Sequence, residues 1–90
     1  MRELFVDTAA VFDERGREHR YDYHIIVDEM NVGQFACESY GLRVREQGSG
    51  VFCAVPNITC SIPRIDELCA MAVRGSVTPA TLRDVVEDWL

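Results

Sequence analysis

The chain has 90 residues, a net charge of −6, and hydrophobic residues at 48% of its positions. A chain of this length forms one domain with a modest core. No apolar run approaches the roughly 18 residues of a membrane span, and the acidic balance disfavours nucleic acid, which binds clustered basic residues. All nine basic residues are arginine, so chemistry that needs a lysine of the protein is excluded.

Alternating apolar and polar residues predict strands in the first part of the chain. Residues 3–12 form the first candidate, and a polar loop with Gly16 follows it. The second strand has the clearest alternation, which indicates one buried and one largely solvated face. Its apolar face consists of Tyr21, Tyr23, Ile25 and Val27. Residues 30–33 supply the next turn.

The apolar positions of the third predicted strand change phase. Phe35 and Cys37 are odd-numbered, whereas Leu42 and Val44 are even-numbered. One extra residue around Tyr40-Gly41 would bring both halves to the same face. We therefore predict a β-bulge there.

The fourth predicted strand covers residues 51–55, after a glycine-rich hairpin loop at residues 46–50. Pro56-Asn57 is expected to end it. The strands together form an antiparallel meander over about residues 3–56. Beyond this point the apolar period changes from about two to about 3.6, which is typical of helices.

The first predicted helix begins after Ser61, which is a good N-cap, and Pro63 is tolerated in its first turn. Its apolar face consists of Ile62, Ile65, Leu68, Cys69, Ala72 and Val73. Gly75 is expected to follow its last turn.

The second predicted helix has Thr78 as N-cap and Pro79 at its first position. Its apolar stripe consists of Leu82, Val85, Val86 and Trp89. Because the connection is short, we expect a roughly antiparallel helical hairpin over about residues 61–90. The order ββββαα predicts a single α+β domain, residues 1–90, in which this hairpin packs on one face of a four-stranded antiparallel sheet.

Acidic residues crowd the end of this last helix. Asp84, Glu87 and Asp88 lie where the helix dipole prefers cations. Docking of a basic partner, or of the arginines of a second copy, would explain this cost, so these residues and Trp89 are our candidate partner-docking residues. The alternative is a solvated helix face on which Arg83 pairs with Glu87.

The four cysteines could form a metal site, disulfides or a redox site. They are Cys37, Cys53, Cys60 and Cys69. Their spacing contains no C-x2-C pair, which most structural zinc sites carry. In a reducing cytosol such residues usually behave as small buried hydrophobes. A catalytic Cys–His pair would have to form in space, and no signature for one is present.

The two histidines carry weak signals. His24 shares the polar face of its strand with Asp22 and Asp28, and a nearby carboxylate can orient an imidazole for base or metal chemistry. Asp28 is about 13 Å away along the strand at ~3.3 Å per residue, so the cluster is incomplete. We interpret His24 as solvent-facing, and His19 likewise.

The aromatic residues could form a stacking platform for single-stranded nucleic acid. The candidates are Tyr21, Tyr23, Tyr40, Phe35 and Phe52. Positive charge around them is lacking, and two of the tyrosines belong to the face that we expect to be buried. Packing in the core is therefore the better interpretation.

Three stretches of the chain resemble an uncharacterised family of short bacterial proteins that is found mainly in Clostridia. They are Ser39-Tyr40-Gly41-Leu42, Pro56-Asn57-Ile58-Thr59, and residues 77–90 with the closing DVVEDWL. The family is known only as a domain of unknown function, and the similarity covers roughly residues 35–90. It implies a cytoplasmic protein of Gram-positive anaerobes and brings no activity, cofactor or binding residues.

No catalytic or cofactor-binding motif is present, so we expect no enzymatic activity, no cofactor and no metal. We also expect a cytoplasmic location, since the first residues lack the apolar segment of a signal peptide. The expected function is a small interaction module that binds a protein partner or itself, for example as a homodimer, and neither nucleic acid nor membrane. The alternative is a thiol- or metal-binding protein that uses the four cysteines. An acidic mimic of nucleic acid is allowed by the net charge alone.

Overall fold

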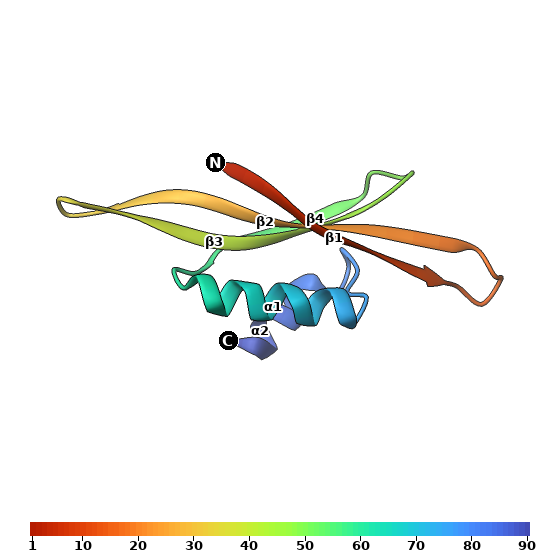
Figure 1. Cartoon of the computed structure of the whole chain (residues 1–90). Helices are drawn as coiled ribbons and strands as arrows, with labels where there is room; N and C mark the ends of the chain where they lie inside the picture. Colours follow the sequence, from red (N-terminus) through yellow and green to blue (C-terminus); the bar gives the residue numbers. More distant parts are fainter.

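The chain forms one antiparallel sheet with the strand order β1-β2-β3-β4, followed by two helices. The elements are β1 (Arg2–Phe12), β2 (Glu18–Val32), β3 (Phe35–Glu46), β4 (Phe52–Thr59), α1 (Ile62–Arg74) and α2 (Leu82–Trp89). In this computed structural model, which describes residues 1–90, both helices lie on the same side of the sheet (Figure 1). The predicted α+β fold with the order ββββαα is confirmed.

We call the side of the sheet that the helices cover the helix face, and the opposite side the open face. The core lies between the helix face and the helices. It consists of Tyr21, Tyr23, Ile25, Val27, Tyr40, Leu42, Val44, Ile65, Leu68, Cys69, Ala72, Val77, Leu82 and Val86. The predicted buried face of β2 is therefore the one that the helices cover. Tyr23 is 1% exposed, and its hydroxyl donates a hydrogen bond of 2.8 Å to the carbonyl oxygen of Val77.

The sheet is much longer than the helix layer. The whole molecule, sheet and helices together, measures 54 × 24 × 17 Å. β1 pairs with β2 only as far as Val27, and β4 pairs with β3 only from Tyr40 onward. Residues 28–39 therefore project beyond the other strands as a two-stranded ribbon, at the yellow end in Figure 1.

The phase change in β3 has a different cause from the predicted one. β2 and β3 pair without a break from Tyr21–Glu46 to Val32–Phe35. Phe35 and Cys37 consequently lie on the open face, because successive residues of an unbroken strand point to opposite faces. The expectation that they point inward with Leu42 is wrong.

A bulge does occur at the predicted place, but the extra residues belong to β4. The β3–β4 register shifts between Tyr40 and Leu42, where residues 56–58 of β4 stand opposite Gly41. A Cβ atom at Gly41 would lie 2.3 Å from the carbonyl oxygen of Val55, so glycine permits this close crossing. The expectation that Pro56-Asn57 ends the strand is wrong: β4 continues to Thr59, with Asn57 at a φ of 55°.

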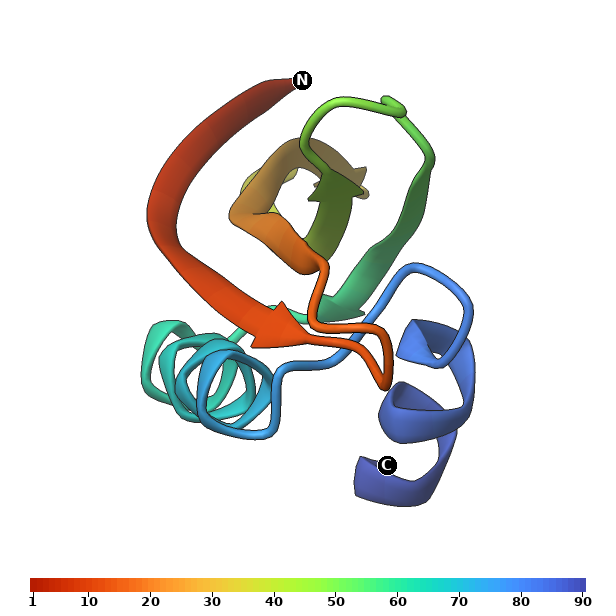
Figure 2. The same ribbon diagram turned by 90° about the vertical axis from the view of Figure 1, so that its right-hand side faces the viewer.

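A second irregularity curves β1. The β1–β2 register shifts between Phe5 and Asp7, which makes Val6 the extra residue. Bulges increase strand bending and twist. Figure 2 shows the N-terminal part of β1 and the first part of β4 curling away from the helices on either side of β2 and β3. The open face is therefore concave.

The first helix agrees closely with its sequence signals. The hydroxyl oxygen of Ser61 accepts a hydrogen bond of 3.3 Å from the backbone N–H of Arg64, and Pro63 lies in the first turn. The N–H of Gly75 donates to the carbonyl oxygen of Met71 and closes the last turn. Ile65, together with Leu68, Cys69 and Ala72, is buried, whereas Ile62 remains 57% exposed.

The second helix begins three residues later than predicted. Residues 78–81 form a turn, and α2 starts at Leu82 with Thr81 as N-cap. The Thr78 and Thr81 hydroxyls lie 3.1 Å apart, and the Thr81 hydroxyl accepts a 3.2 Å hydrogen bond from the Thr78 N–H. These contacts engage the Thr78 side chain within the turn, so it does not cap the helix.

α2 runs back toward the start of α1 but is clearly inclined to it, and it packs on β4 (Figures 1 and 2). The Arg64 guanidinium, near the start of α1, lies 4.1 Å from the centre of the Trp89 ring at the end of α2. This cation–π contact holds the two helix ends together. Neither helix combines the length and hydropathy that crossing a bilayer requires.

Candidate functional site

The phenylalanines form the most unusual feature of the surface. The chain contains four, and all are exposed: Phe5 by 60%, Phe12 by 66%, Phe35 by 70% and Phe52 by 57%. The tyrosines, by contrast, are buried: Tyr21, Tyr23 and Tyr40 are 7%, 1% and 8% exposed. The aromatic platform considered from the sequence is thus divided, with its tyrosines in the core and Phe35 and Phe52 on the surface.

The strand register places all four phenylalanine rings on the open face. Residues directly opposite each other in antiparallel strands share a face. Phe5 stands opposite His24, and Phe12 opposite Glu18. Phe35 stands opposite Val32, and Phe52 opposite Arg45. The first three partners are even-numbered residues of β2, and Arg45 stands opposite Asp22, which is also even-numbered. Odd-numbered residues of β2 form the core, so the even-numbered ones face away from the helices.

The open face is hollowed at its centre. The hollow measures about 310 Å³ and is lined by Met1, Glu3, Ile26, Arg43, Phe52 and Ala54. Ile26 of β2 and Arg43 of β3 line it from the central strands, and Glu3 of β1 with Phe52 and Ala54 of β4 line it from the outer strands. The Arg43 guanidinium lies 3.0 Å from Glu3 Oε1 and 4.6 Å from the centre of the Phe52 ring. An ion pair and a cation–π contact therefore fix Arg43 across the hollow.

His24 lies beside this hollow and is not the solvent-facing residue that its strand pattern indicates. The Phe5 ring meets the His24 ring edge-on at a centroid distance of 5.5 Å. The Nδ1 atom of His24 is buried and has no hydrogen-bond partner. Asp22, its neighbour on the polar face, accepts hydrogen bonds from Thr8 and Gln47 instead. The alternation within β2 could not reveal that Phe5 of the neighbouring strand covers His24.

The ribbon adds further apolar surface to the open face. Its cross-strand pairs on this face are Met30 with Cys37 and Val32 with Phe35. Met30 is 38% exposed and Val32 is 61% exposed. The apolar surface therefore continues beyond the hollow to the end of the ribbon.

Charged side chains on the open face are paired within the chain, with two exceptions. Glu3 pairs with Arg43, and Glu18 pairs with Arg20. Asp28, at the base of the ribbon, has no ion pair or side-chain hydrogen bond, and neither has Arg45, toward the other end of the face. Arg45 stands opposite Asp22, whose Oδ1 atom accepts hydrogen bonds from Gln47 and Thr8. These hydrogen bonds lower the pKa of Asp22, and the charge of Arg45 contributes to the lowering.

The acidic end of α2 is exposed. Asp84, Glu87 and Asp88 form no ion pair, and the alternative pairing of Arg83 with Glu87 is not present. Trp89 is half-buried against Arg64. A hollow of about 410 Å³ beside it is lined by Met71, Val85, Asp88 and Trp89.

The cysteines do not form a site. No disulfide joins them, and no group of three or more His, Cys, Asp or Glu side chains is arranged to hold a metal ion. Cys60 is exposed, whereas Cys69 is buried in α1. Burial raises the pKa of the Cys69 thiol to about 11, which keeps it protonated and unreactive at neutral pH.

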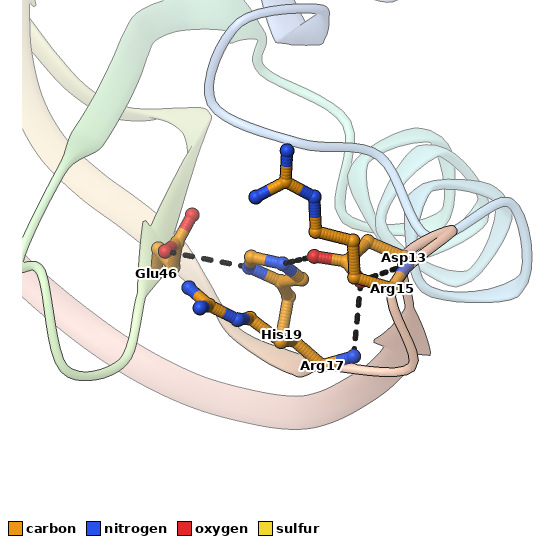
Figure 3. A network of polar contacts seen from close by, with 5 residues as sticks. All are labelled: Asp13, Arg15, Arg17, His19 and Glu46. Carbon is orange, nitrogen blue, oxygen red and sulfur yellow. Dashed lines mark hydrogen bonds and ion pairs between the residues drawn. The ribbon is translucent and has the colours of Figure 1, made fainter.

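The sequence pattern did not indicate the polar network at the loop between β1 and β2. His19 lies between two carboxylates, with its Nε2 atom 2.9 Å from Asp13 Oδ2 and its Nδ1 atom 3.7 Å from Glu46 Oε1 (Figure 3). Asp13 Oδ1 also accepts the backbone N–H groups of Arg15 and Arg17. The hydrogen bond between the side chains raises the pKa of His19 and lowers that of Asp13. The network ties the loop to the end of β3 (Figure 3).

The comparisons with known proteins identify a family without a known activity. No curated protein and no solved structure matches the chain. One protein family does match, described as Family of unknown function (DUF6514), over residues 2–90. The match includes the first 34 residues, which the resemblance seen in the sequence did not cover. The chain therefore belongs to the family of unknown function DUF6514.

Proposed function

We propose that this protein is a small protein-interaction module whose contact surface is the open face of its sheet. One observation carries the proposal: all four phenylalanines lie on that face with exposures between 57% and 70%. A phenylalanine buries about 150–250 Å² when it is covered, so four rings at this exposure present roughly 350–600 Å². The largest apolar patch on a typical monomer is about 300–600 Å² and is often functional.

The energetics are sufficient for a specific complex. Covering this aromatic surface gains on the order of 10 kcal/mol at about 25 cal/mol per Å². Association costs on the order of 4–15 kcal/mol, which the partner's own apolar surface helps to offset. Interfaces of this kind combine aromatic anchors with arginine, and Arg43 already lies against Phe52.

A thiol- or metal-binding function, the alternative, lacks a supporting observation. The four thiols lie on β3, β4, the β4–α1 connection and α1, and none is paired. Reduced, unpaired cysteines are typical of the cytosol, so we place the module in the cytoplasm as part of the proposal. A non-enzymatic role also belongs to it.

The proposal is tested by photo-crosslinking in cells, with p-benzoylphenylalanine in place of Phe35. The matched control carries the same photo-reactive residue in place of Glu67, which is exposed on α1. We expect a protein adduct from position 35 that disappears when Phe52→Asp is added, and none of the same mass from position 67. No adduct from position 35, or equal adducts from both positions, would refute the contact surface.

The acidic end of α2 is a second candidate surface, because Asp84, Glu87 and Asp88 are exposed without a partner charge. Trp89 beside them would supply an apolar contact. If a basic partner docks there, Glu87→Ser with Asp88→Ser weakens its binding, and the loss is larger at low ionic strength. Unchanged binding in the double variant removes this surface from consideration.

A further inference from the structure

We infer that the outer edge of β2 in the ribbon, residues 29–32, binds an extended basic segment of a partner protein as an added antiparallel strand. Arginine or lysine side chains of this segment lie beside Glu29, and its apolar side chains lie beside Met30 and Val32. The inference rests on the proposed function and names the chemistry of the partner.

The backbone of this edge is free to pair. The carbonyl oxygen of Arg20 accepts a 2.8 Å hydrogen bond from the Gln47 N–H, in the register of the β2–β3 ladder. Backbone groups of successive strand residues point to opposite sides, so even-numbered residues of β2 direct theirs to β3 and odd-numbered residues direct theirs to β1. β1 pairs with β2 only as far as Val27. The backbone N–H and C=O groups of Glu29 and Asn31 therefore have no neighbouring strand.

The charges of the ribbon decide which strand can pair there. Free sheet edges are templates for another strand, and proteins commonly block them with proline, lysine or a bulge. Residues 29–32 contain no proline and no lysine, and their pairing with β3 has no bulge. The ribbon instead carries Asp28, Glu29 and Glu38 and no basic residue. A second copy of the chain would bring the same negative charges to the edge, whereas a basic strand is attracted to it.

Two glutamates face each other across the ribbon and leave room for a cation. Glu29 stands directly opposite Glu38, and like charges in that position are destabilising. The Arg2 guanidinium compensates only one of them: its Nη2 atom lies 2.6 Å from Glu38 Oε2, and Glu29 has no ion pair. A hollow of about 220 Å³ is lined by both glutamates together with Ala36 and Cys37. A basic side chain from a partner would remove the remaining repulsion.

β1 shows how a side chain of the added strand reaches this hollow. Arg2 is the last residue of β1 that pairs with β2, opposite Val27. Because β2 lies between β1 and β3, the Arg2 side chain must cross β2 to reach Glu38. A strand added beyond Arg2 continues the line of β1, and its residue opposite Glu29 shares the face of Glu29. An arginine or lysine at that position reaches the hollow by the same path.

Apolar surface defines the other side of the partner segment. Met30 is 38% exposed and Val32 is 61% exposed, and both lie on the open face of the ribbon. Residues of the added strand that stand opposite them face the same way, so apolar side chains there extend the apolar surface. In strand addition the main-chain hydrogen bonds supply affinity and the alternating side chains supply specificity. The partner segment is therefore one in which basic and apolar residues alternate.

Fluorescence polarisation with a short labelled peptide in which arginine and valine alternate tests the inference. A peptide of the same composition, with its arginines in one block, controls for charge alone and should bind about tenfold more weakly or worse. N-methylation of the arginine residues should abolish binding, because their N–H groups face Glu29 and Asn31 in the added strand. N-methylation of the valine residues, whose N–H groups face away from β2, should leave binding nearly unchanged.

Variants and amide exchange locate the binding edge. We expect Glu29→Arg to weaken binding of the alternating peptide by about tenfold or more. Glu14→Arg is the matched control, since Glu14 is exposed in the loop between β1 and β2 without an ion pair, and it should have a much smaller effect. Hydrogen exchange measured by NMR should slow at Glu29 and Asn31 when the peptide binds, and it should change little at Met30, whose N–H faces β3. Circular dichroism confirms that each variant is folded.

The outcomes separate this inference from the proposed function. The added strand is overturned if the alternating peptide does not bind, if the block peptide binds equally well, or if exchange at Glu29 and Asn31 stays fast. Exchange that slows there with rising protein concentration, without peptide, would show a second copy at the edge and overturn the basic partner. A position-35 adduct together with no peptide binding leaves the proposed function standing. Absence of the adduct refutes the open face as a contact surface, whatever the peptide does.

Discussion

The two faces of the sheet use their aromatic residues in opposite ways. The helix face buries the three tyrosines to 8% exposure or less, and the open face leaves the four phenylalanines at least 57% exposed. Phenylalanine is the more apolar of the two, so hydrophobicity alone would reverse this distribution. Burial is therefore decided by which face the helices cover. The exposed phenylalanines of the open face need another explanation.

Polar partners explain why tyrosine suits the helix face. Tyr23 donates its hydroxyl proton to the carbonyl oxygen of Val77 in the inter-helix connection, and Tyr40 donates to a carboxylate oxygen of Glu38 at 3.2 Å. Burial raises the pKa of Tyr23 to about 12, so it remains a hydrogen-bond donor at every physiological pH. Phenylalanine has no polar group that would need a hydrogen-bond partner on the open face.

Truncation should separate the two faces most sharply. Leu42→Ala removes a side chain that is 1% exposed in the core, and we expect a loss of about 2–5 kcal/mol in the free energy of unfolding. Phe35→Ala, on the open face, should change the stability of the dilute protein by about 0.5 kcal/mol or less. Urea unfolding of both variants at low concentration measures this. Equal losses would show that the open face is part of the monomer's core.

The crossing of β4 over β3 is the next most sensitive point. Gly41→Ala places a Cβ atom against the backbone of Val55 and Pro56, with no flexible side chain that could move aside. We expect a loss of about 1–3 kcal/mol or more, typical of overpacking. Gly48→Ala has open space around it but a φ of 88°, and it serves as a control for backbone strain alone. A Gly41→Ala loss below that of Gly48→Ala would contradict the bulge.

A smaller effect is expected at the hydrogen bond between the sheet and the helix connection. Tyr23→Phe keeps the ring but leaves the carbonyl oxygen of Val77 without the Tyr23 hydroxyl. We expect a loss of about 1 kcal/mol, the usual net value of such a bond. Thermal unfolding of Tyr23→Phe and of Tyr40→Phe, whose Glu38 partner lies nearer solvent, compares the two bonds. The larger loss should be at Tyr23.

The smallest effect is the pH dependence of the His19 network. The pKa of His19 is raised above 6.5, so its stabilisation is complete below pH 6.5 and disappears as the pH rises through the raised value. The pKa of Asp13 is lowered below 3.8, so its share is present above pH 3.8 and is lost as the pH falls through the lowered value. Thermal unfolding of the wild type and of His19→Gln is compared between pH 5 and 9. The unfolding temperature of the wild type should show an additional decrease as the pH rises, which His19→Gln lacks. Parallel curves for the two proteins would contradict this.

The sequence predicted the helix face far better than the open face. The alternation of Tyr21, Tyr23 and Ile25, and the apolar stripe around Leu68, depend on local periodicity, which a single sequence shows directly. Phe35 was assigned to the wrong face because β3 was read alone. Its true direction follows from the unbroken pairing with β2, and its phase change reflects a bulge that β4 carries.

The candidate site could not be predicted for the same reason. Phe5, Phe12, Phe35 and Phe52 come from three strands, and only the register between strands brings them to one face. The late start of α2 has a local cause, since the contacts between Thr78 and Thr81 compete with capping. The acidic residues near Trp89 were recognised from the sequence, and the structure leaves them exposed without assigning them a partner.

Fluorine NMR of protein labelled with fluorophenylalanine tests the central claim most directly. All four phenylalanines lie on the open face, so every signal reports that face and none reports the core. At low concentration all four signals should respond strongly to a soluble paramagnetic probe. When the labelled protein binds a partner in cell lysate, or itself at high concentration, the signals should shift and lose this response, as the rings become covered. Four signals that stay fully accessible, both at high concentration and in cell lysate, would show that the open face contacts nothing.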